Sequence, residues 1–243
     1  TFTEVARTIT SALFADELST EQIDRVITRA FPFRPELSRL TDEIYLLELY
    51  HGPSCAFKDY GASYLASVME EFRAGEDGRA VILTATSGDT GSAVAHAFYG
   101  RSNIDVVVLY PSGRVSPLQE KQLTTLGGNI HALEVKGSFD DCQRMVKQAF
   151  LDPELSETLR LTSANSINLG RLIPQAFYYV YAFSRLKSKV PGELFFCVPS
   201  GNFGNLTAGV LAWKWGLPVT GVIAATNAND VVPEYLETGM YSP

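Results

Sequence analysis

Apolar and polar positions alternate along the chain between short β-branched runs and longer stretches with helical spacing. The short runs predict strands at residues 44–49, 81–85, 105–110, 130–135, 194–198 and 219–225. The helical spacing predicts helices at residues 19–30, 58–72, 92–99, 117–125, 138–150, 169–186 and 206–215. Strands and helices in this order are typical of a mostly parallel sheet that helices cover on both faces. We therefore predict an α/β fold with mostly parallel sheets.

Connection lengths divide the predicted fold into two parts. Between residues 87 and 150, strands and helices follow one another with short connections, which favours a self-contained unit. We therefore expect a small α/β subdomain around residues 87–150. Residues 44–86 and 151–243 then form part of a larger domain, and residues 1–43 form a helical segment before it.

Composition excludes several classes of protein. The 243 residues are 46% apolar and 19% charged, as in ordinary globular proteins. A formal net charge of -7 argues against nucleic acid or an acidic membrane surface as a general partner. The apolar runs are too short to span a bilayer, and no basic segment followed by an apolar one opens the chain, so we expect a cytoplasmic protein. The chain starts without methionine and stops without a polar tail, so we expect a piece of a longer protein.

Cysteine and histidine positions indicate neither a disulfide framework nor a metal site. The residues concerned are Cys55, Cys142, Cys197, His51, His96 and His131. The cysteines are odd in number and widely spaced, and the histidines show no metal-ligand spacing. We therefore predict no metal.

Lys58 stands in the opening turn of the predicted helix at residues 58–72, directly after a turn of small residues. The positive end of the helix dipole disfavours an ammonium group at this position. The neutral amine is the form that condenses with a carbonyl to give a Schiff base. The alternative is a solvated first-turn lysine, which fits less well with the apolar residues 55–57 just before it.

Two turns follow predicted strands at the points where parallel sheets bind ligands. In residues 200–205, glycines and the free N–H groups of the next helix suit a phosphate, although an ordinary Gly/Asn turn is equally consistent. In residues 87–91, hydroxyls and glycines suit a substrate carboxylate, although Asp89 could simply cap a helix. Together with Lys58, these turns suggest a site for an aldehyde that carries a phosphate.

Arg171 falls in the first turn of the long predicted helix at residues 169–186. A guanidinium is unfavourable there unless an anion binds beside it. Asn165 and Ser166 could add hydrogen-bond donors to the same anion. The alternative is a polar helix entry in which Arg171 points to solvent.

Several segments, in this order along the chain, resemble threonine synthase in the branch found in many bacteria and in fungi. They are residues 51–59 (HGPSCAFKD), 83–91 (LTATSGDTG), 116–121 (SPLQEK), 165–168 (NSIN) and 198–204 (VPSGNFG). The resemblance extends from about residue 33 to the end. It implies a fold type II, tryptophan synthase β-like enzyme that uses pyridoxal 5'-phosphate. Such an enzyme converts O-phosphohomoserine and water to threonine and phosphate.

The resemblance also implies a role for each residue of the motifs. Lys58 holds the cofactor and then moves protons on the substrate carbons. The loop around the cofactor phosphate consists of Gly201, Asn202, Phe203, Gly204 and Asn205. Asp89 lies near the ring hydroxyl, and Ser87, Gly88, Asp89 and Thr90 take the substrate carboxylate. Thr90, Asn165, Ser166 and Arg171 hold the substrate phosphate. The cofactor is then bound by the large domain, residues 44–86 and 151–243.

Members of the family are considerably longer at both ends, so the resemblance implies an internal fragment. The missing part after residue 243 would supply the partner of the pyridine nitrogen. Two other classes stay open: a pyridoxal-phosphate lyase that only eliminates phosphate from a phosphorylated amino acid, and a non-catalytic fragment that keeps the fold. The sequence does not indicate the oligomeric state.

Overall fold

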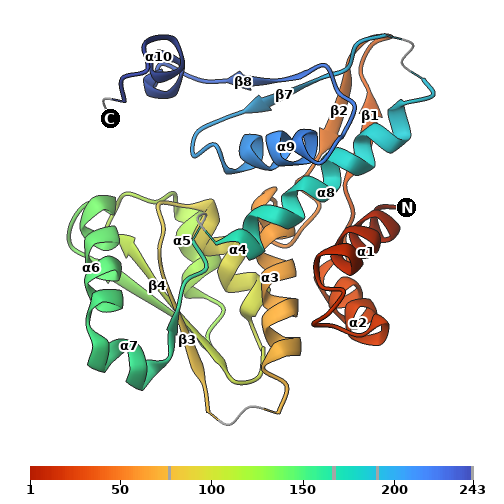
Figure 1. Ribbon diagram of the computed structural model, residues 1–243. Helices are drawn as coiled ribbons and strands as arrows, with labels where there is room; N and C mark the ends of the chain where they lie inside the picture. Colours follow the sequence, from red (N-terminus) through yellow and green to blue (C-terminus); the bar gives the residue numbers. More distant parts are fainter. Residues whose placement is uncertain (76–77, 166–167, 190–191, 242–243) are drawn as a thin grey trace.

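The computed structural model describes residues 1–75, 78–165, 168–189 and 192–241. At the N-terminus, helices α1 (Phe2–Leu13) and α2 (Thr20–Ala30) each begin with a capping box. An antiparallel hairpin of β1 (Glu36–Arg39) and β2 (Tyr45–Glu48) follows. Helix α1 packs on α8 (Leu169–Leu186) and α2 packs on α3 (Lys58–Phe72), as Figure 1 shows. The N-terminal helices therefore lie beside the two helices that carry Lys58 and Arg171.

The central sheet is fully parallel, with strand order β5-β4-β3-β6. Its strands are β3 (Ala80–Ala85), β4 (Ile104–Pro111), β5 (Ile130–Val135) and β6 (Leu161–Thr162). The helices that connect them are α4 (Asp89–Phe98), α5 (Pro117–Thr124), α6 (Phe139–Leu151) and α7 (Pro153–Leu159).

Alternate residues of the central strands enter different cores. Ile82, Val106 and Val108 pack in a cluster with α3, α4 and α5, whereas Leu83 and Leu109 pack against α6 on the opposite face. Helices thus cover both faces of this sheet, because successive strand side chains point to opposite sides and both sides are apolar. The predicted α/β class is confirmed.

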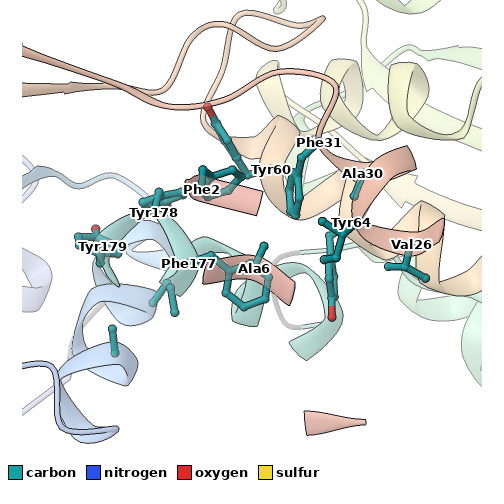
Figure 2. Packing of buried hydrophobic residues seen from close by; sticks show 14 of the residues in the cluster. Phe2, Ala6, Val26, Ala30, Phe31, Tyr60, Tyr64, Phe177, Tyr178 and Tyr179 are labelled. Atoms are coloured by element: carbon teal, nitrogen blue, oxygen red, sulfur yellow. The ribbon is translucent and has the colours of Figure 1, made fainter. Parts of the chain in front are cut away.

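The C-terminal part begins with α8 and continues with β7 (Phe195–Pro199), α9 (Gly204–Lys214), β8 (Gly221–Ala225) and α10 (Val231–Thr238). Strands β7 and β8 pair in parallel, and α9 packs on α8. Figure 2 shows the aromatic cluster that joins this part to the N-terminal helices. Tyr60 and Tyr64 from α3 both meet Phe31, and they meet Tyr178 and Phe177 of α8, respectively.

Helix α3 is shared by two cores. Tyr60 and Tyr64 belong to the aromatic cluster, while Ala62, Leu65 and Ala66 belong to the cluster beneath the central sheet. Because α3 packs against a core on either side, it is buried on nearly all sides, and its sequence correspondingly has only weak amphipathic character. The start of α3, which carries Lys58, is therefore fixed by packing against both the aromatic cluster and the cluster beneath the central sheet.

Several sequence-based boundaries differ from the structure. Helix α4 begins at Asp89 rather than 92, and α9 begins at Gly204 rather than 206, because each helix starts inside its glycine-containing turn. The elements α1, α7, β1 and β6 were not predicted individually, although residues 1–43 were expected to form a helical segment. Strand β3 pairs with β4 on one side and with β6 on the other, so this sheet includes strands from before and after residues 87–150. No helix within the described ranges is both long and apolar enough to cross a membrane.

Candidate active site

Two neighbouring cavities lie where β3 and β7 end and where α3, α4, α8 and α9 begin. The larger has a volume of about 520 Å³ and the smaller a volume of about 130 Å³. Phe57, Lys58, Asn202 and Gly204 line both cavities. Lys58 therefore stands at the junction of the two spaces.

Every predicted site residue in the described ranges lines one of these cavities. The larger is lined by Lys58, Ser87, Gly88, Asp89, Thr90, Asn165 and Arg171, and the smaller by Gly201, Asn202, Phe203, Gly204 and Asn205. Ser166 lies outside the described residues. The structure brings the motifs together, and the role of each residue toward a ligand stays a prediction.

Lys58 is the first residue of α3, as predicted. Its Nζ donates to Asp89 Oδ2 at 3.3 Å and lies 5.1 Å from the centroid of the Phe57 ring. Because the lysine side chain is only 18% exposed, the solvated alternative is not what the structure shows. The expectation of an uncharged amine stays a prediction.

Asp59, which the sequence analysis did not single out, fixes the turn before Lys58. Its fully buried carboxylate accepts from Ser54 N at 2.9 Å and from Ser54 Oγ at 2.6 Å. Burial raises the pKa of Asp59, and the two bonds from Ser54 oppose this effect. A Cβ at Gly52 would lie 2.4 Å from Asp59 Oδ2, so glycine is needed there for the turn to close. The position of Lys58 thus depends on a buried carboxylate next to it.

The loop at residues 86–91 is organised by Thr86, another residue that the sequence analysis missed. Thr86 Oγ1 donates to Gly88 O at 2.8 Å and accepts from Gly88 N at 3.0 Å and from Gly91 N at 2.9 Å. A Cβ at Gly91 would lie 2.5 Å from Thr86 Cγ2. This buried hydroxyl therefore shapes the loop that presents Ser87, and the loop needs glycine at 91.

The loop at residues 200–205 surrounds the smaller cavity. Phe203 adopts a left-handed backbone conformation with φ 58°, and a Cβ at either Gly201 or Gly204 would meet no atom within 4 Å. Asn205 Oδ1 accepts from Tyr178 Oη at 2.5 Å and from Tyr179 Oη at 2.7 Å. The aromatic helix α8 thus anchors the loop while leaving open space beside its glycines.

Arg171 is 2% exposed, so the alternative in which it points to solvent is wrong. Its Nη1 donates to Ala164 O, and its buried Nε has no hydrogen-bond partner among the described residues. Burial lowers the pKa of Arg171 to about 10, because the charged form is poorly solvated there. Nearby, Thr84 Oγ1 donates to Asn165 Oδ1 at 2.6 Å. A buried cation with an unused N–H at a cavity wall is suited to an anionic ligand.

The N-cap residues of α3, α4 and α9, three helices that begin at these cavities, make no side-chain hydrogen bond to the helix N-terminus. In α4, Thr86 Oγ1 accepts from Gly91 N in the first turn. The N-cap residues of α1, α2, α5, α6, α7 and α8 do make such a bond, whereas that of α10, away from the cavities, does not. Uncapped N-terminal amides are donors, and the helix dipole favours negative charge beside them. The cavities therefore combine several anion-binding features.

Further polar residues of the larger cavity had escaped the sequence analysis: Gln119, Gln143, Lys147 and Gln175. Helical spacing in the sequence could have indicated some of these residues. Gln143 and Lys147 are four residues apart on α6, as are Arg171 and Gln175 on α8, and residues at this spacing share a helix face. Gln119 stands in the motif at residues 116–121, to which no role had been given.

Glu36, Glu48 and His51 form a separate cluster outside the two cavities, with possible ligand atoms within 4.8 Å of one another. The pairing of β1 with β2 sets Glu36 opposite Glu48. Glu48 also lies 3.1 Å from His51 Nε2 and accepts from Ser38 Oγ at 2.5 Å. Ser38 and His51 therefore hold the Glu48 carboxylate, and the absence of a metal stays a prediction.

Residues 32–243 match the family model described as pyridoxal-phosphate dependent enzyme. The chain therefore belongs to this family, and pyridoxal phosphate is the cofactor that its membership indicates. Among its relatives, the threonine synthase of Serratia marcescens is 52% identical over 235 residues, which is 97% of this chain and 54% of the relative. The predicted resemblance to threonine synthase is thus confirmed.

Solved structures also show a similarity to threonine synthases. The crystal structure of threonine synthase from Escherichia coli matches with a TM-score of 0.91 and 51% identity, over 100% of this chain and 56% of that chain. The pyridoxal-phosphate-bound threonine synthase from Brucella melitensis matches with a TM-score of 0.90 and 41% identity, over 100% and 53%. The fold type II architecture is confirmed. The chain spans about half the length of the relatives it matches.

The residues present fit such a cofactor. An aldehyde needs an amine, which Lys58 presents at the junction of the cavities. A phosphate needs main-chain donors and space, and the uncapped start of α9 provides both beside Gly201 and Gly204. The larger cavity then has room for a substrate next to the same amine.

Proposed function

We propose that the protein containing this chain is a threonine synthase, which converts O-phosphohomoserine and water to threonine and phosphate. The buried guanidinium of Arg171, with its unpartnered Nε, carries this proposal. It lies in the same cavity as Lys58, so it gives the cofactor site a place for a second phosphate, that of the substrate. The high identity to threonine synthases supports the same conclusion.

When bound, pyridoxal phosphate supplies an electron sink that stabilises a carbanion beside the substrate amino group. In this proposal, Lys58 holds the cofactor aldehyde, and the loop of Gly201, Asn202, Phe203, Gly204 and Asn205 holds the cofactor phosphate. Released Lys58 then accepts the α-proton and a β-proton of the substrate. Phosphate leaves the γ-carbon with the electrons of its C–O bond, and one of the removed protons moves to the γ-carbon. The hydroxyl of water then adds at the β-carbon, the α-carbon regains a proton, and the remaining proton goes to the phosphate.

The remaining residues of the larger cavity orient the substrate. Ser87, Gly88 and Thr90 receive its carboxylate at the start of α4, with Asp89 close to the cofactor ring. Thr90, Asn165, Ser166 and Arg171 hold its phosphate. Contacts to this phosphate act twice, because they bind the substrate and also stabilise the charge that develops on the leaving group.

We also propose that the domain division follows the site. The large domain, 44–86 with 151–243, would hold the cofactor, the subdomain around 87–150 would hold the substrate carboxylate, and 1–43 would form the helical segment before them. The pairing of β3 with both β4 and β6 supports an extension of the smaller unit at both ends. We place the protein in the cytoplasm, since Cys55, Cys142 and Cys197 are free thiols, as is usual in reducing compartments.

The test is an assay of the full-length protein with O-phosphohomoserine. We expect equal amounts of threonine and phosphate, visible absorbance from bound cofactor, and a pyridoxyl label on Lys58 after borohydride reduction and peptide mapping. Lys58→Ala should remove turnover, absorbance and label while the fold survives. Lys136→Ala, which removes an exposed lysine outside both cavities, should retain all of them.

Other outcomes would replace the proposal. A 2-oxo acid and ammonia in place of threonine would identify a lyase that only eliminates phosphate. Absence of absorbance and of label on Lys58 would indicate a protein that keeps the fold without the chemistry.

A further inference from the structure

Gln119, on α5, connects the helix cap to the candidate site. Ser116 is the N-cap of α5, and Gln119 completes a capping box with it. Gln119 Oε1 accepts from Ser116 Oγ at 3.0 Å and from Ser116 N at 3.4 Å. Its Nε2 donates to Asp89 Oδ1 at 2.8 Å. One side chain therefore serves both the start of α5 and the start of α4.

The capping box determines which way the Gln119 amide points. Ser116 N is a donor, so the group that faces it must be the acceptor Oε1. The amide is planar, and Nε2 consequently faces Asp89. Because Asp89 Oδ2 also accepts from Lys58 Nζ at 3.3 Å, the hydrogen bonds run without interruption from α5 through α4 to α3.

The backbone at Gly88 makes room for this contact. A Cβ there would lie 2.5 Å from Gln119 Nε2, far closer than packed atoms approach. A side chain at 88 would therefore push the Gln119 amide away from Asp89, so this hydrogen bond depends on glycine at 88.

Asp89 needs such support because its side chain is 48% exposed. An exposed carboxylate with one weak contact, to a lysine at 3.3 Å, has other rotamers open to it in water. The Gln119 N–H selects the rotamer in which the second oxygen faces Lys58.

We propose that Gln119 is a positioning residue that holds the Asp89 carboxylate against Lys58 and the cofactor ring. The inference rests on the proposed function of the larger cavity. In this proposal α5, one of the helices that connect the strands of the central sheet, orients the Asp89 carboxylate toward Lys58 at the start of α3.

Gln119→Glu in the full-length holoenzyme separates the two tasks of this side chain. Glutamate keeps the capping-box acceptor, and negative charge is favourable in the first turn of a helix, so the melting temperature should stay close to wild type. The variant loses the N–H and sets a carboxylate against Asp89. Loss of a hydrogen bond to a charged group predicts a fall in kcat of about ten- to a hundredfold.

The pH dependence of the cofactor absorbance is the second measurement. The charged groups that share the cavity with Asp89 are Lys58 from α3, Lys147 from α6 and Arg171 from α8. Two facing carboxylates favour a nearby positive charge, so the midpoint of the absorbance change should move to higher pH in Gln119→Glu. Gln122→Glu adds the same charge to α5 outside the cavity and should leave the rate and the midpoint unchanged.

Asp89→Asn provides a double-mutant cycle. If Gln119 acts through Asp89, Gln119→Glu should have little further effect on kcat in the Asp89→Asn background, because glutamate can accept from the new amide. Three results would each overturn the inference: a wild-type rate and midpoint in Gln119→Glu, equal losses in Gln122→Glu, or additive losses in the cycle. In each case the pyridoxyl label on Lys58 would still support the proposed function. A wild-type protein without that label would overturn both.

Discussion

At the residue scale, Arg171 is the most unusual group in the described part of the chain. A cation that is 2% exposed and faces no carboxylate partner among those residues is unfavourable for folding. Burial lowers the pKa of Arg171 to about 10, below its usual value of 12.5, so the penalty is present at every pH below about 10 and falls as the pH rises through it. Such a group is explained by a ligand that supplies the missing negative charge.

Arg171→Met should therefore separate stability from function. We expect the apoprotein to be as stable as wild type or more stable, because an uncompensated buried charge is removed. The kcat/KM for O-phosphohomoserine should fall by about ten- to a hundredfold, since charged hydrogen bonds to the phosphate are lost. Chemical denaturation and steady-state kinetics measure the two effects.

Inorganic phosphate provides an independent check on Arg171. It should raise the melting temperature of wild-type apoprotein at constant ionic strength, because it binds only the folded state, and it should do so much less in Arg171→Met. Arg185→Met, an exposed change on the same helix, is the matched control and should respond like wild type. Equal responses of all three proteins would contradict an anion site at Arg171.

At the element scale, the crossing of α3 and α8 sets the distance between the amine and the guanidinium. The crossing is close because Gly61 of α3 faces the main chain of α8. A Cβ at Gly61 would lie 2.4 Å from Arg171 O. The two helices thus carry Lys58 and Arg171 to the same cavity through a contact that only glycine allows.

Gly61→Ala should destabilise the protein by about 1–3 kcal/mol through overpacking, although alanine is the better helix former. It should also weaken cofactor absorbance by moving the helices apart. Gly204→Ala, where a Cβ at the first residue of α9 meets no atom within 4 Å, should leave the unfolding free energy of the apoprotein close to wild type. Equal unfolding free energies for Gly61→Ala and Gly204→Ala in denaturation experiments would contradict a tight crossing of α3 and α8.

The start of α6 predicts a pH effect on stability. Ser138 N and Ser138 Oγ both donate to Asp141 Oδ2 at 2.8 Å, and these bonds together with Arg144 lower the pKa of Asp141 from 3.8 to about 2. Because the folded-state pKa is depressed, the stabilisation is complete well above pH 4 and is lost as the pH falls toward about 2.

Asp141→Asn should consequently be less stable than wild type at pH 7, with a difference that shrinks at pH 3. Urea denaturation at the two pH values measures it. Asp140→Asn is the matched control, since Asp140 is an exposed neighbour in the same turn. A difference for Asp141→Asn that is the same at both pH values would show that its ionisation does not stabilise α6.

At the scale of the whole molecule, the sequence predicted the features that repeat along the chain. Alternating strands and helices predicted the parallel sheet, and glycine-containing turns after strands predicted two of the loops that line the cavities. Short elements such as β6, with two residues, carry too little pattern to be detected. β1, between Glu36 and Arg39, has exposed ends and no apolar alternation.

The missed residues share a different cause. Gln119 and Lys147 act through neighbours that only the folded chain provides: Gln119 meets Asp89 across 30 residues, and Lys147 reaches the cavity from α6. Thr86 instead bonds to Gly88 and Gly91 close by, where a single threonine has no distinctive spacing. Local spacing predicted where Arg171 lies on its helix, but its burial depends on α3 and on Ala164. Tertiary contacts of this kind do not leave a local signature.

The three uncapped helix starts around the cavities have a consequence for the protein before it meets its ligands. Unprotected ends of this kind open easily, and local opening admits proteases. A newly synthesised molecule would therefore survive longer where vitamin B6 is plentiful than where it is scarce.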